Sequence, residues 1–161
     1  MYDIESKYES ESFYEDLHAE LVAMILGEKN QIANLANISS WIYHAMPDLN
    51  WCGFYLWNKE DSELVLGPFQ GRPACIRIKP LKGVCGTAYS FGKSLLVDDV
   101  NDFAGHIACD SASVSELVIP MKKDNFIFGV LDLDSPIKGR FTERDEKGLN
   151  KIMDVLSRHL F

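Results

Sequence analysis

Residues 115–134, SELVIPMKKDNFIFGVLDLD, hold two apolar runs on either side of a short polar turn. Ser115–Met121 and Phe126–Asp134 are rich in β-branched, aromatic and other apolar residues, which predicts two neighbouring strands of one antiparallel hairpin. The second run ends by alternating strictly between leucine and aspartate. Because side chains in a strand point alternately to its two faces, Asp132 and Asp134 are expected to share one face.

The turn of this hairpin decides where Glu116 points. A loop with an odd number of residues, such as Lys123–Asn125, places Glu116 directly opposite Asp132 and adds it to the acidic face. An even loop, Lys122–Asn125, pairs it with Leu131 and turns it to the other face. We favour the odd loop, because its asparagine tolerates the left-handed conformation that such a loop uses.

Helical patterns flank the predicted sheet in the sequence. Apolar residues recur every three or four positions in two early segments and in one late segment, as expected of amphipathic helices. Gly27 and Pro47 mark the ends of the two early segments, and Thr142 with Asp145 forms a capping box at the start of the late one. The predicted helices are Glu11–Leu26, Gln31–Met46 and the segment from Thr142 to about His159.

Between the early helices and residue 115 the chain changes to short apolar runs and turns. Trp51–Trp57 is aromatic and apolar, as in a strand buried on both faces, and is expected to form a hairpin with Glu63–Gln70. Since strands and helices do not alternate regularly, we predict an α+β fold. It has a mainly antiparallel sheet of about six strands, with two N-terminal helices and one C-terminal helix on one side. The remaining predictions are strands at Ala74–Ile78 and Ser94–Val97, one or two helical turns at Thr87–Phe91, and a long loop at Asp98–Ser113.

Length, charge and hydropathy limit what the protein can be. At 161 residues the chain is expected to form one domain, 1–161, with a loosely ordered polar tail at 1–10. A net charge of -8 argues against nucleic acid as the main partner, since phosphate binding needs clustered Lys and Arg. No apolar run approaches membrane-spanning length, and the acidic first residues do not form a signal peptide. We therefore expect no membrane association and a cytoplasmic location.

The chain has four cysteines, and a cytoplasmic location keeps their thiols reduced. In that setting we expect the cysteines to be catalytic or simply buried rather than a disulfide framework. No two of them form a Cys-x-x-Cys pair, so we expect no structural zinc site. Cys109 lies in the small, polar, turn-prone stretch Gly105–Glu116, three residues after His106, where a substrate or a second sulfur can approach the thiol closely. A solvent loop with an incidental cysteine is the alternative interpretation. The other cysteines are Cys52, Cys75 and Cys85.

Asp132 and Asp134 are close enough on one strand face to influence each other's ionisation. Like charges raise each other's pKa, so one of the two carboxyl groups is expected to retain a proton. Such a pair can bind an ammonium group or act as a general acid. The alternative is a solvated acidic face at the edge of the sheet.

Five motifs follow one another along the chain: Asn50-Trp51-x-Gly53-Phe54-Tyr55, Leu66-Gly67-Pro68-Phe69-Gln70-Gly71, Gly83-Val84-Cys85-Gly86-Thr87-Ala88, Gly105-His106-Ile107-Ala108-Cys109-Asp110 and Gly129-Val130-Leu131-Asp132-Leu133-Asp134-Ser135. In this order they closely resemble the free methionine-(R)-sulfoxide reductases, which are small stand-alone GAF-domain enzymes. The similarity extends from about Phe13 to the end of the last helix. The combination of motifs is far more specific than any one of them, and it implies a GAF-like fold.

The resemblance implies an oxidoreductase that reduces free L-methionine-(R)-sulfoxide to methionine. By motif position, the family's catalytic cysteine falls on Cys109, its main resolving cysteine on Cys75, and a further cysteine that can take part on Cys85. The catalytic cysteine becomes a sulfenic acid and then a disulfide, which thioredoxin reduces, and no metal or organic cofactor is needed. Cys52 occupies a motif position that does not demand cysteine, and we interpret it as a small core residue. Members of the family tend to form a homodimer, although no stretch here identifies an interface.

The resemblance also assigns a substrate site. The family's substrate-binding acids fall on Glu116, Asp132 and Asp134, and its aromatic pocket wall on Trp51 and Tyr55. A protonated carboxyl group can supply the proton that the departing sulfoxide oxygen needs, while ionised neighbours pair with the ammonium of a free amino acid. Two alternatives stay open: a GAF module that senses a small ligand without chemistry, and a peroxide-sensing thiol switch.

Overall fold

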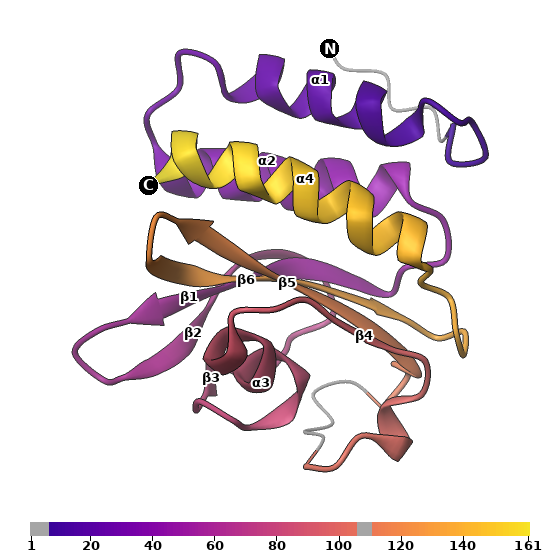
Figure 1. The fold of residues 1–161 in the computed structure, drawn as a ribbon, viewed down its shortest axis with the longest axis vertical. Coiled ribbons are helices and arrows are strands. Elements are labelled where there is room, and N and C mark those ends of the chain that lie inside the picture. The colour runs from indigo at the N-terminus through magenta and orange to yellow at the C-terminus, as the bar shows by residue number, and fades with distance from the viewer. Residues whose placement is uncertain (1–6, 106–110) are drawn as a thin grey trace.

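The computed structural model describes residues 7–105 and 111–161. Within these ranges the chain forms four α-helices, one short 3-10 helix and six strands (Figure 1). None of the described helices is both long and apolar enough to cross a membrane. The helices are α1 (Phe13–Ile25), α2 (Gln31–Ala45), α3 (Gly83–Phe91), η1 (Val100–Asp102) and α4 (Glu143–Leu160). The strands are β1 (Trp51–Asn58), β2 (Glu63–Gly71), β3 (Arg77–Ile78), β4 (Leu95–Val97), β5 (Ser115–Lys123) and β6 (Phe126–Ser135).

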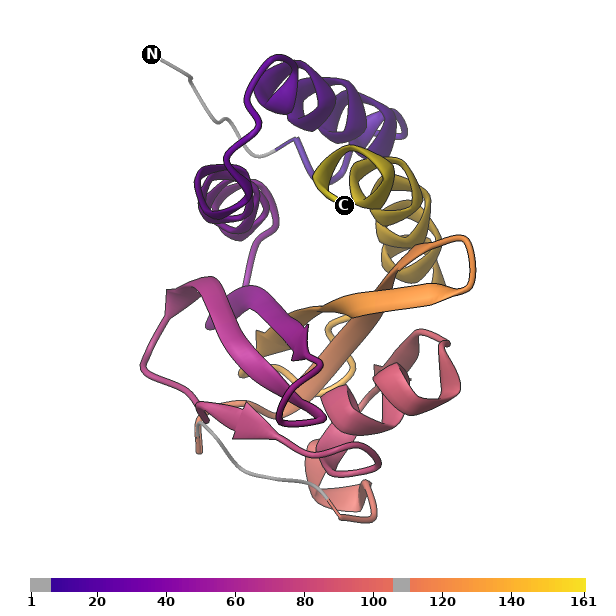
Figure 2. The ribbon, with the colours of Figure 1, turned by 90° about the vertical axis from the view of Figure 1, so that its left-hand side faces the viewer.

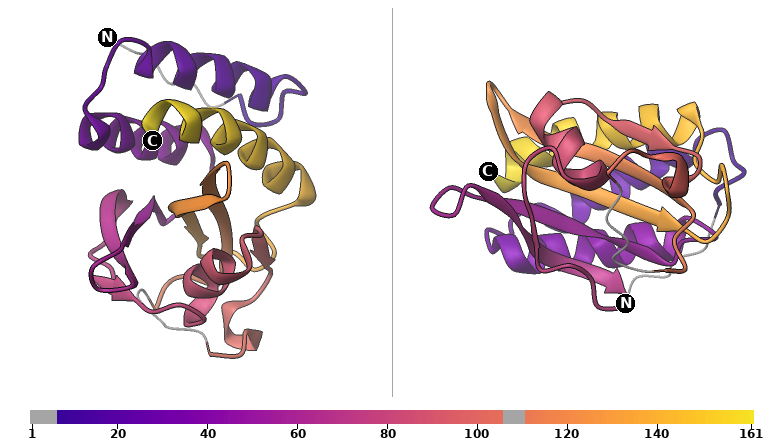
Figure 3. Two further views of the ribbon diagram at one scale, coloured as in Figure 1. Left: turned by 60° about the vertical axis from the view of Figure 1, so that its left-hand side comes forward. Right: turned by 90° about the horizontal axis from the view of Figure 1, so that it is seen from below.

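The described strands form one sheet in the order β3-β2-β1-β6-β5-β4, and every pairing in it is antiparallel. The predicted α+β fold is therefore confirmed. α2 and α4 pack on one face of the sheet, and α1 lies outside them (Figures 1 and 2). The short α3 lies across the opposite face, as the view from below shows (Figure 3). The expectation that helices cover one side thus holds for the three long helices but not for α3.

Strand alternation divides the apolar side chains between the two faces of the sheet. Leu117, Ile119, Leu131 and Leu133 point toward the long helices and share a buried core with the apolar stripes of α1, α2 and α4. The residues between them on β5 and β6 point toward α3, where a smaller second core includes Val118. The acidic residues of these two strands fall on the α3 face.

The turn of the β5–β6 hairpin differs from the prediction. Lys123 pairs with Phe126, so the connection is only two residues long. Asp124, rather than Asn125, has a positive φ, of 54°. Both predicted loop lengths are wrong, because strand pairing continues two residues closer to the turn than the apolar run indicates.

A β-bulge then shifts the register of this hairpin by one residue. Met121 pairs with Gly129, whereas the next residue on β5, Lys122, pairs with Ile127, which leaves Phe128 as an extra residue on β6. At Gly129 the bulged strand lies against the backbone of β1, and an added Cβ would lie 2.1 Å from a β1 carbonyl oxygen. This position therefore requires glycine.

The bulge determines which residues face each other at the far end of the hairpin. Glu116 lies opposite Asp134, and Val118 lies opposite Asp132. The predicted pairing of Glu116 with Asp132 is wrong, although the two side chains do share a face. A two-residue turn without the extra residue would place Glu116 opposite Leu133 and turn it toward the long helices.

The third strand is shorter than predicted. β3 comprises only two residues, and Cys75 lies in the loop before it rather than on the strand. Two side chains of β1 donate hydrogen bonds to carbonyl oxygens of this loop. Trp51 Nε1 donates to the carbonyl oxygen of Arg72 at 3.0 Å, and the Tyr55 hydroxyl donates to that of Cys75 at 2.9 Å. These two hydrogen bonds hold the loop against β1.

α3 begins four residues before the predicted helical turns. It starts at Gly83 instead of Thr87, so Cys85 lies in the first turn of a helix. The Thr87 hydroxyl donates to the Gly83 carbonyl oxygen at 2.6 Å and closes this turn. The two glycines at residues 83 and 86 explain why the pattern places the start later, because glycine disfavours a helix unless packing compensates.

The start of α4 ties the N-terminal part of the chain to the rest of the fold. The predicted capping box is present: the Thr142 side chain accepts from the backbone N–H of Asp145, and the Asp145 side chain accepts from that of Thr142. The buried Asp145 carboxylate also accepts hydrogen bonds from the hydroxyl groups of Tyr8 and Tyr14. Tyr8 belongs to the tail that was expected to be loosely ordered, of which residues 1–6 lie outside the described ranges.

Candidate active site

A pocket lies on the α3 face of the sheet, between the central strands and the loop that precedes β3. Its floor is formed by side chains of β1, β5 and β6, and the first turn of α3 forms one side. Six residues that the sequence analysis assigned to the site line this pocket: Trp51, Tyr55, Cys85, Glu116, Asp132 and Asp134.

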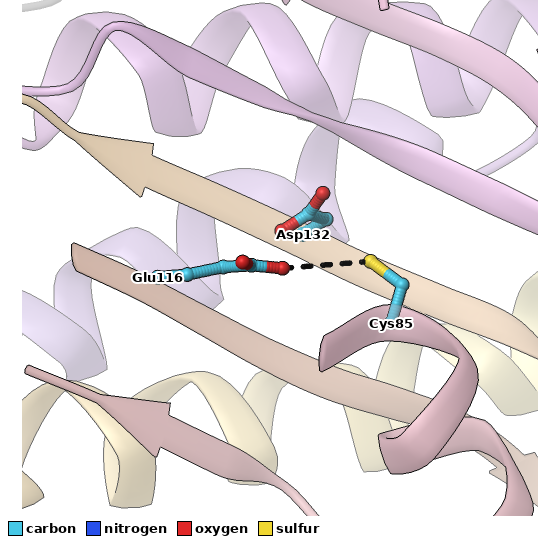
Figure 4. Close-up of side chains that lie close together, drawn as sticks. All are labelled: Cys85, Glu116 and Asp132. Atoms are coloured by element: carbon cyan, nitrogen blue, oxygen red, sulfur yellow. Dashed lines mark hydrogen bonds between the residues drawn. The ribbon is translucent and has the colours of Figure 1, made fainter. Parts of the chain in front are cut away.

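Three buried groups meet in the pocket, as Figure 4 shows. Glu116 and Asp132 are each 6% exposed, and Cys85 is 3% exposed. Cys85 Sγ donates to Glu116 Oε1 at 3.8 Å, and the sulfur and one carboxylate oxygen from each acid all lie within 4.8 Å of one another. The three residues come from α3, β5 and β6, so packing of regular elements holds the cluster together.

Burial changes the ionisation of this cluster. Burial, followed by the charge of Asp132, raises the pKa of Glu116 well above its usual range. Burial also raises the pKa of Asp132 to about 6. Burial, followed by the same Asp132 charge, raises the pKa of the Cys85 thiol. At neutral pH the cluster therefore retains a proton on Glu116 next to a mostly ionised Asp132, and Cys85 stays a thiol.

An aromatic wall closes one side of the pocket. Trp51 stacks on Tyr55 with ring centroids 5.9 Å apart, and on Phe69 of β2 with centroids 5.2 Å apart. A Cβ on Gly53 would lie 2.3 Å from Phe69 Cβ and 2.7 Å from the Trp51 ring. The glycine of this motif therefore makes room for the wall, and the two hydrogen bonds to loop carbonyl groups fix the orientation of its rings.

Asp134 extends the acidic face toward the end of β6. It is half-buried and lies between Trp51 on β1 and Glu116 on β5, its ladder partners on the two sides. Lys82, at the N-cap of α3, is the one cation among the described residues that line the pocket. Three carboxyl groups against one exposed ammonium favour a small cationic group in the interior.

The four cysteines lie in different places. Cys109, like His106, lies outside the described residues, so its predicted role stays a prediction. Cys75 is half-buried in the loop at the aromatic wall, and Cys85 is buried in the acid cluster. Cys52 is fully buried in the core on the long-helix face, away from the pocket, which agrees with its interpretation as a core residue.

The described ends of the loop that contains Cys109 lie at the pocket. The carbonyl oxygen of Gly105 accepts a hydrogen bond from the backbone N–H of Gly83, at the start of α3, at 3.2 Å. Ser113 lines the pocket, and its hydroxyl accepts from the Asn50 side-chain amide at 3.0 Å. These contacts connect both flanks of residues 106–110 to the pocket rim.

Sequence reasoning missed two residues of the site. Phe69 stacks on Trp51 and supports the aromatic wall. The feature that could have revealed it is its position opposite Gly53 in the β1–β2 hairpin. Lys82 lines the pocket, and it was missed because α3 was predicted to begin at Thr87. Lys82 could have been found by extending the predicted helical turns toward the N-terminus, whereas Phe69 already lay within the predicted strand Glu63–Gln70.

The antiparallel sheet, its two leading helices and closing helix, and the pocket under α3 together define a GAF domain. The GAF domain family model matches residues 30–160 of the chain.

Relatives identify the group of GAF proteins more closely. Protein YtsP of Bacillus subtilis is 53% identical over 152 residues, which cover 94% of this chain and 93% of that protein. Free methionine-R-sulfoxide reductase of Escherichia coli is 49% identical over 148 residues, which cover 92% of this chain and 88% of that enzyme. The X-ray structure of free methionine-R-sulfoxide reductase from Neisseria meningitidis in complex with its substrate is 36% identical, with a TM-score of 0.92 over 99% of this chain and 96% of that one. The chain belongs to the free methionine-R-sulfoxide reductase family of GAF-domain proteins.

Proposed function

We propose that this protein reduces free L-methionine-(R)-sulfoxide to L-methionine, with Cys109 as the nucleophile. The observation that carries the proposal is the buried acid cluster facing an aromatic wall, at the rim of which both flanks of the Cys109 loop are anchored. The Escherichia coli and Neisseria meningitidis relatives are named free methionine-R-sulfoxide reductase, and we infer the same reaction for this protein. The pocket supplies a place for each part of the substrate.

The acids divide the binding of the amino acid from the chemistry. Asp134 and ionised Asp132 lie on one face of β6 and pair with the substrate ammonium, a group that peptide-bound methionine lacks. Trp51 and Tyr55 contact the apolar side chain of the substrate. Glu116, whose pKa is raised by burial, keeps the proton that the sulfoxide oxygen requires.

The proposed reaction balances with thiols alone. The Cys109 thiolate attacks the sulfoxide sulfur while Glu116 protonates the oxygen. The resulting hydroxyl group moves to the Cys109 sulfur as its bond to the substrate sulfur breaks, so methionine leaves and Cys109 becomes a sulfenic acid. A second thiol then attacks the sulfenic acid, which releases water and forms a disulfide. Thioredoxin reduces this disulfide and becomes oxidised itself. Glu116 regains its proton from solvent.

Cys75 is the better resolving cysteine of the two candidates. It is half-buried in a loop, whereas Cys85 is 3% exposed, lies in a helix and donates to Glu116. A disulfide to Cys85 would break that hydrogen bond and offer thioredoxin little access to the sulfur. We therefore assign the main resolving role to Cys75 and a secondary one to Cys85.

A turnover experiment tests the proposal. Purified protein is supplied with free methionine-(R)-sulfoxide, thioredoxin, thioredoxin reductase and NADPH, and methionine and NADPH are measured. We expect turnover by the wild type and by Cys52→Ala, and none by Cys109→Ser even within a single turnover. Binding of the sulfoxide without methionine formation would instead favour a ligand-sensing module, and reaction with peroxide but not sulfoxide would favour a thiol switch.

A further inference from the structure

We propose that Cys85, Glu116 and Asp132 form a binding site for a thiophilic divalent cation, with Zn²⁺ as the probe, and that the bound ion inhibits the enzyme. The site is formed by the thiol and the two carboxyl groups that Figure 4 shows. Its occupation blocks the acid cluster. The inhibition rests on the proposed function, whereas the binding does not.

The geometry suits a compact tetrahedral ion. One ligand atom from each residue lies within 4.8 Å of the other two, and the sulfur is 3.8 Å from Glu116 Oε1. Tetrahedral Zn²⁺ with bonds of about 2.3 Å to sulfur and 2.0–2.2 Å to oxygen holds its ligand atoms about 3.3–3.6 Å apart. Small side-chain rotations therefore close the cluster around an ion, and a water molecule can supply the fourth ligand.

A second observation points to a ligand at the same place. Asp132 Oδ1 is buried and has no hydrogen-bond partner among the described residues. A buried carboxylate oxygen without a partner is costly, so the pocket gains when a cationic group enters. Because the oxygen belongs to a residue that is only 6% exposed, bulk water is a poor substitute.

The thiol distinguishes a metal ion from the substrate ammonium. An ammonium group gains little from Cys85, since sulfur is a weak hydrogen-bond acceptor. Zn²⁺ instead binds thiolate strongly and also accepts carboxylate oxygens, and it deprotonates a thiol that it coordinates. Coordination therefore replaces the Cys85 proton, which leaves to solvent.

Binding can be measured without turnover. In a Cys75→Ser/Cys109→Ser background, which leaves Cys52 and Cys85 as the two cysteines of the chain, Zn²⁺ is titrated against a chromogenic chelator at neutral pH. We expect one ion per chain, and a loss of affinity of at least about tenfold in the same background with Cys85→Ala or Asp132→Asn. Cys52→Ala, which removes a buried thiol on the other face of the sheet, is the matched control and should leave the affinity unchanged.

A second measurement does not depend on how the variants fold. Co²⁺ added to the background protein should give a thiolate-to-cobalt charge-transfer band, and free methionine sulfoxide should abolish it by competition. A cobalt complex without that band, or Zn²⁺ affinity equal in the Cys85→Ala and Cys52→Ala proteins, would overturn the proposal. If methionine sulfoxide does not displace the ion, the two do not share the acid cluster, and the proposed inhibition is wrong. Failure of the wild type to turn over the sulfoxide, with Zn²⁺ still bound, would contradict the proposed function alone.

Discussion

Glu116 on β5 lies directly opposite Asp134 on β6, with Asp132 two residues further along the same strand face. Like charges directly across a strand pair are destabilising, so this arrangement weakens the fold whenever all three acids are ionised. The raised pKa of Glu116 relieves part of the repulsion by keeping one group neutral. In the proposed reaction the ionised acids bind the substrate ammonium, and Glu116 supplies the proton.

The acid cluster should make the stability of the protein depend on pH. The folded-state pKa of Asp132 is raised from 3.8 to about 6, so between these values the folded state binds more protons than the unfolded state. Stability therefore falls as the pH rises through this window, and the raised pKa of Glu116 acts in the same direction. Asp132→Asn removes the part of this loss that comes from Asp132. The free energy of unfolding of the variant, relative to that of the wild type, should therefore be about 2–3 kcal/mol higher at pH 7 than at pH 3.5.

Urea unfolding of both proteins at the two pH values measures this gain. Asp154→Asn, an exposed acid on α4, is the control and should show no gain. Equal effects of Asp132→Asn at pH 3.5 and pH 7 would show that Asp132 is not held in a destabilised ionised state.

The position of the Trp51 ring in the aromatic wall should depend on the absence of a side chain at Gly53. Gly53→Ala adds a Cβ 2.3 Å from Phe69 Cβ and 2.7 Å from the Trp51 ring, so the ring that lines the pocket must move. We expect a stability loss of about 1–3 kcal/mol by overpacking and an increase in KM for the sulfoxide larger than the decrease in kcat. Gly67→Ala, where the nearest contact is 3.1 Å, is the matched control. An unchanged KM in Gly53→Ala would mean that Trp51 does not position the substrate.

The resolving thiol can be identified by mapping disulfides. Cys75→Ser should release about one methionine per enzyme in a single turnover but recycle poorly with thioredoxin, because the sulfenic acid on Cys109 lacks its accessible partner. Mass mapping of oxidised wild-type protein should find Cys75 linked to Cys109. Cys85→Ala should retain that link, and a dominant link between Cys85 and Cys109 in the wild type would transfer the resolving role to Cys85.

The sequence predicts most of the fold because its patterns are local. The apolar stripes of the helices, the capping box of Thr142 and Asp145, and the alternation of Leu131 to Asp134 are each contained in a few residues, and the structure has all of them. The bulge at Phe128 could not be predicted in this way. It depends on how closely Gly129 approaches the backbone of β1, which is a tertiary contact.

The parts of the site that the sequence misplaced have the same cause. Cys75 was predicted on a strand, but it lies in a loop that accepts hydrogen bonds from Trp51 and Tyr55, which are about 20 residues earlier in the chain. Cys85 lies before the predicted helical turns at Thr87–Phe91, but packing under the sheet supports a helix that begins at Gly83. Side-chain types and strand parity were sufficient to gather the acids on one face, whereas the distance between Cys85 and Glu116 needed the whole fold.

Free and blocked substrates should separate the two roles of the acids. N-acetylation of methionine-(R)-sulfoxide removes the ammonium and leaves buried carboxylates unpaired, a loss of about 2–5 kcal/mol by comparison with truncated buried ion pairs. The wild type should therefore have a far lower kcat/KM for the acetylated substrate.

Asp134→Asn removes a partner of the ammonium, so it should lower kcat/KM for the free substrate and reduce the discrimination between the two substrates. Glu116→Gln removes the proton donor, so it should lower kcat for both substrates and leave their ratio near that of the wild type, while the exposed Glu143→Gln changes neither. Equal kcat/KM values for free and acetylated substrate in the wild type would refute the pairing with ammonium, even if Cys109 proves to be the nucleophile. If the ratio of kcat/KM for free to acetylated substrate falls toward one in Glu116→Gln but not in Asp134→Asn, then Glu116 is the ammonium partner and Asp134 the proton donor.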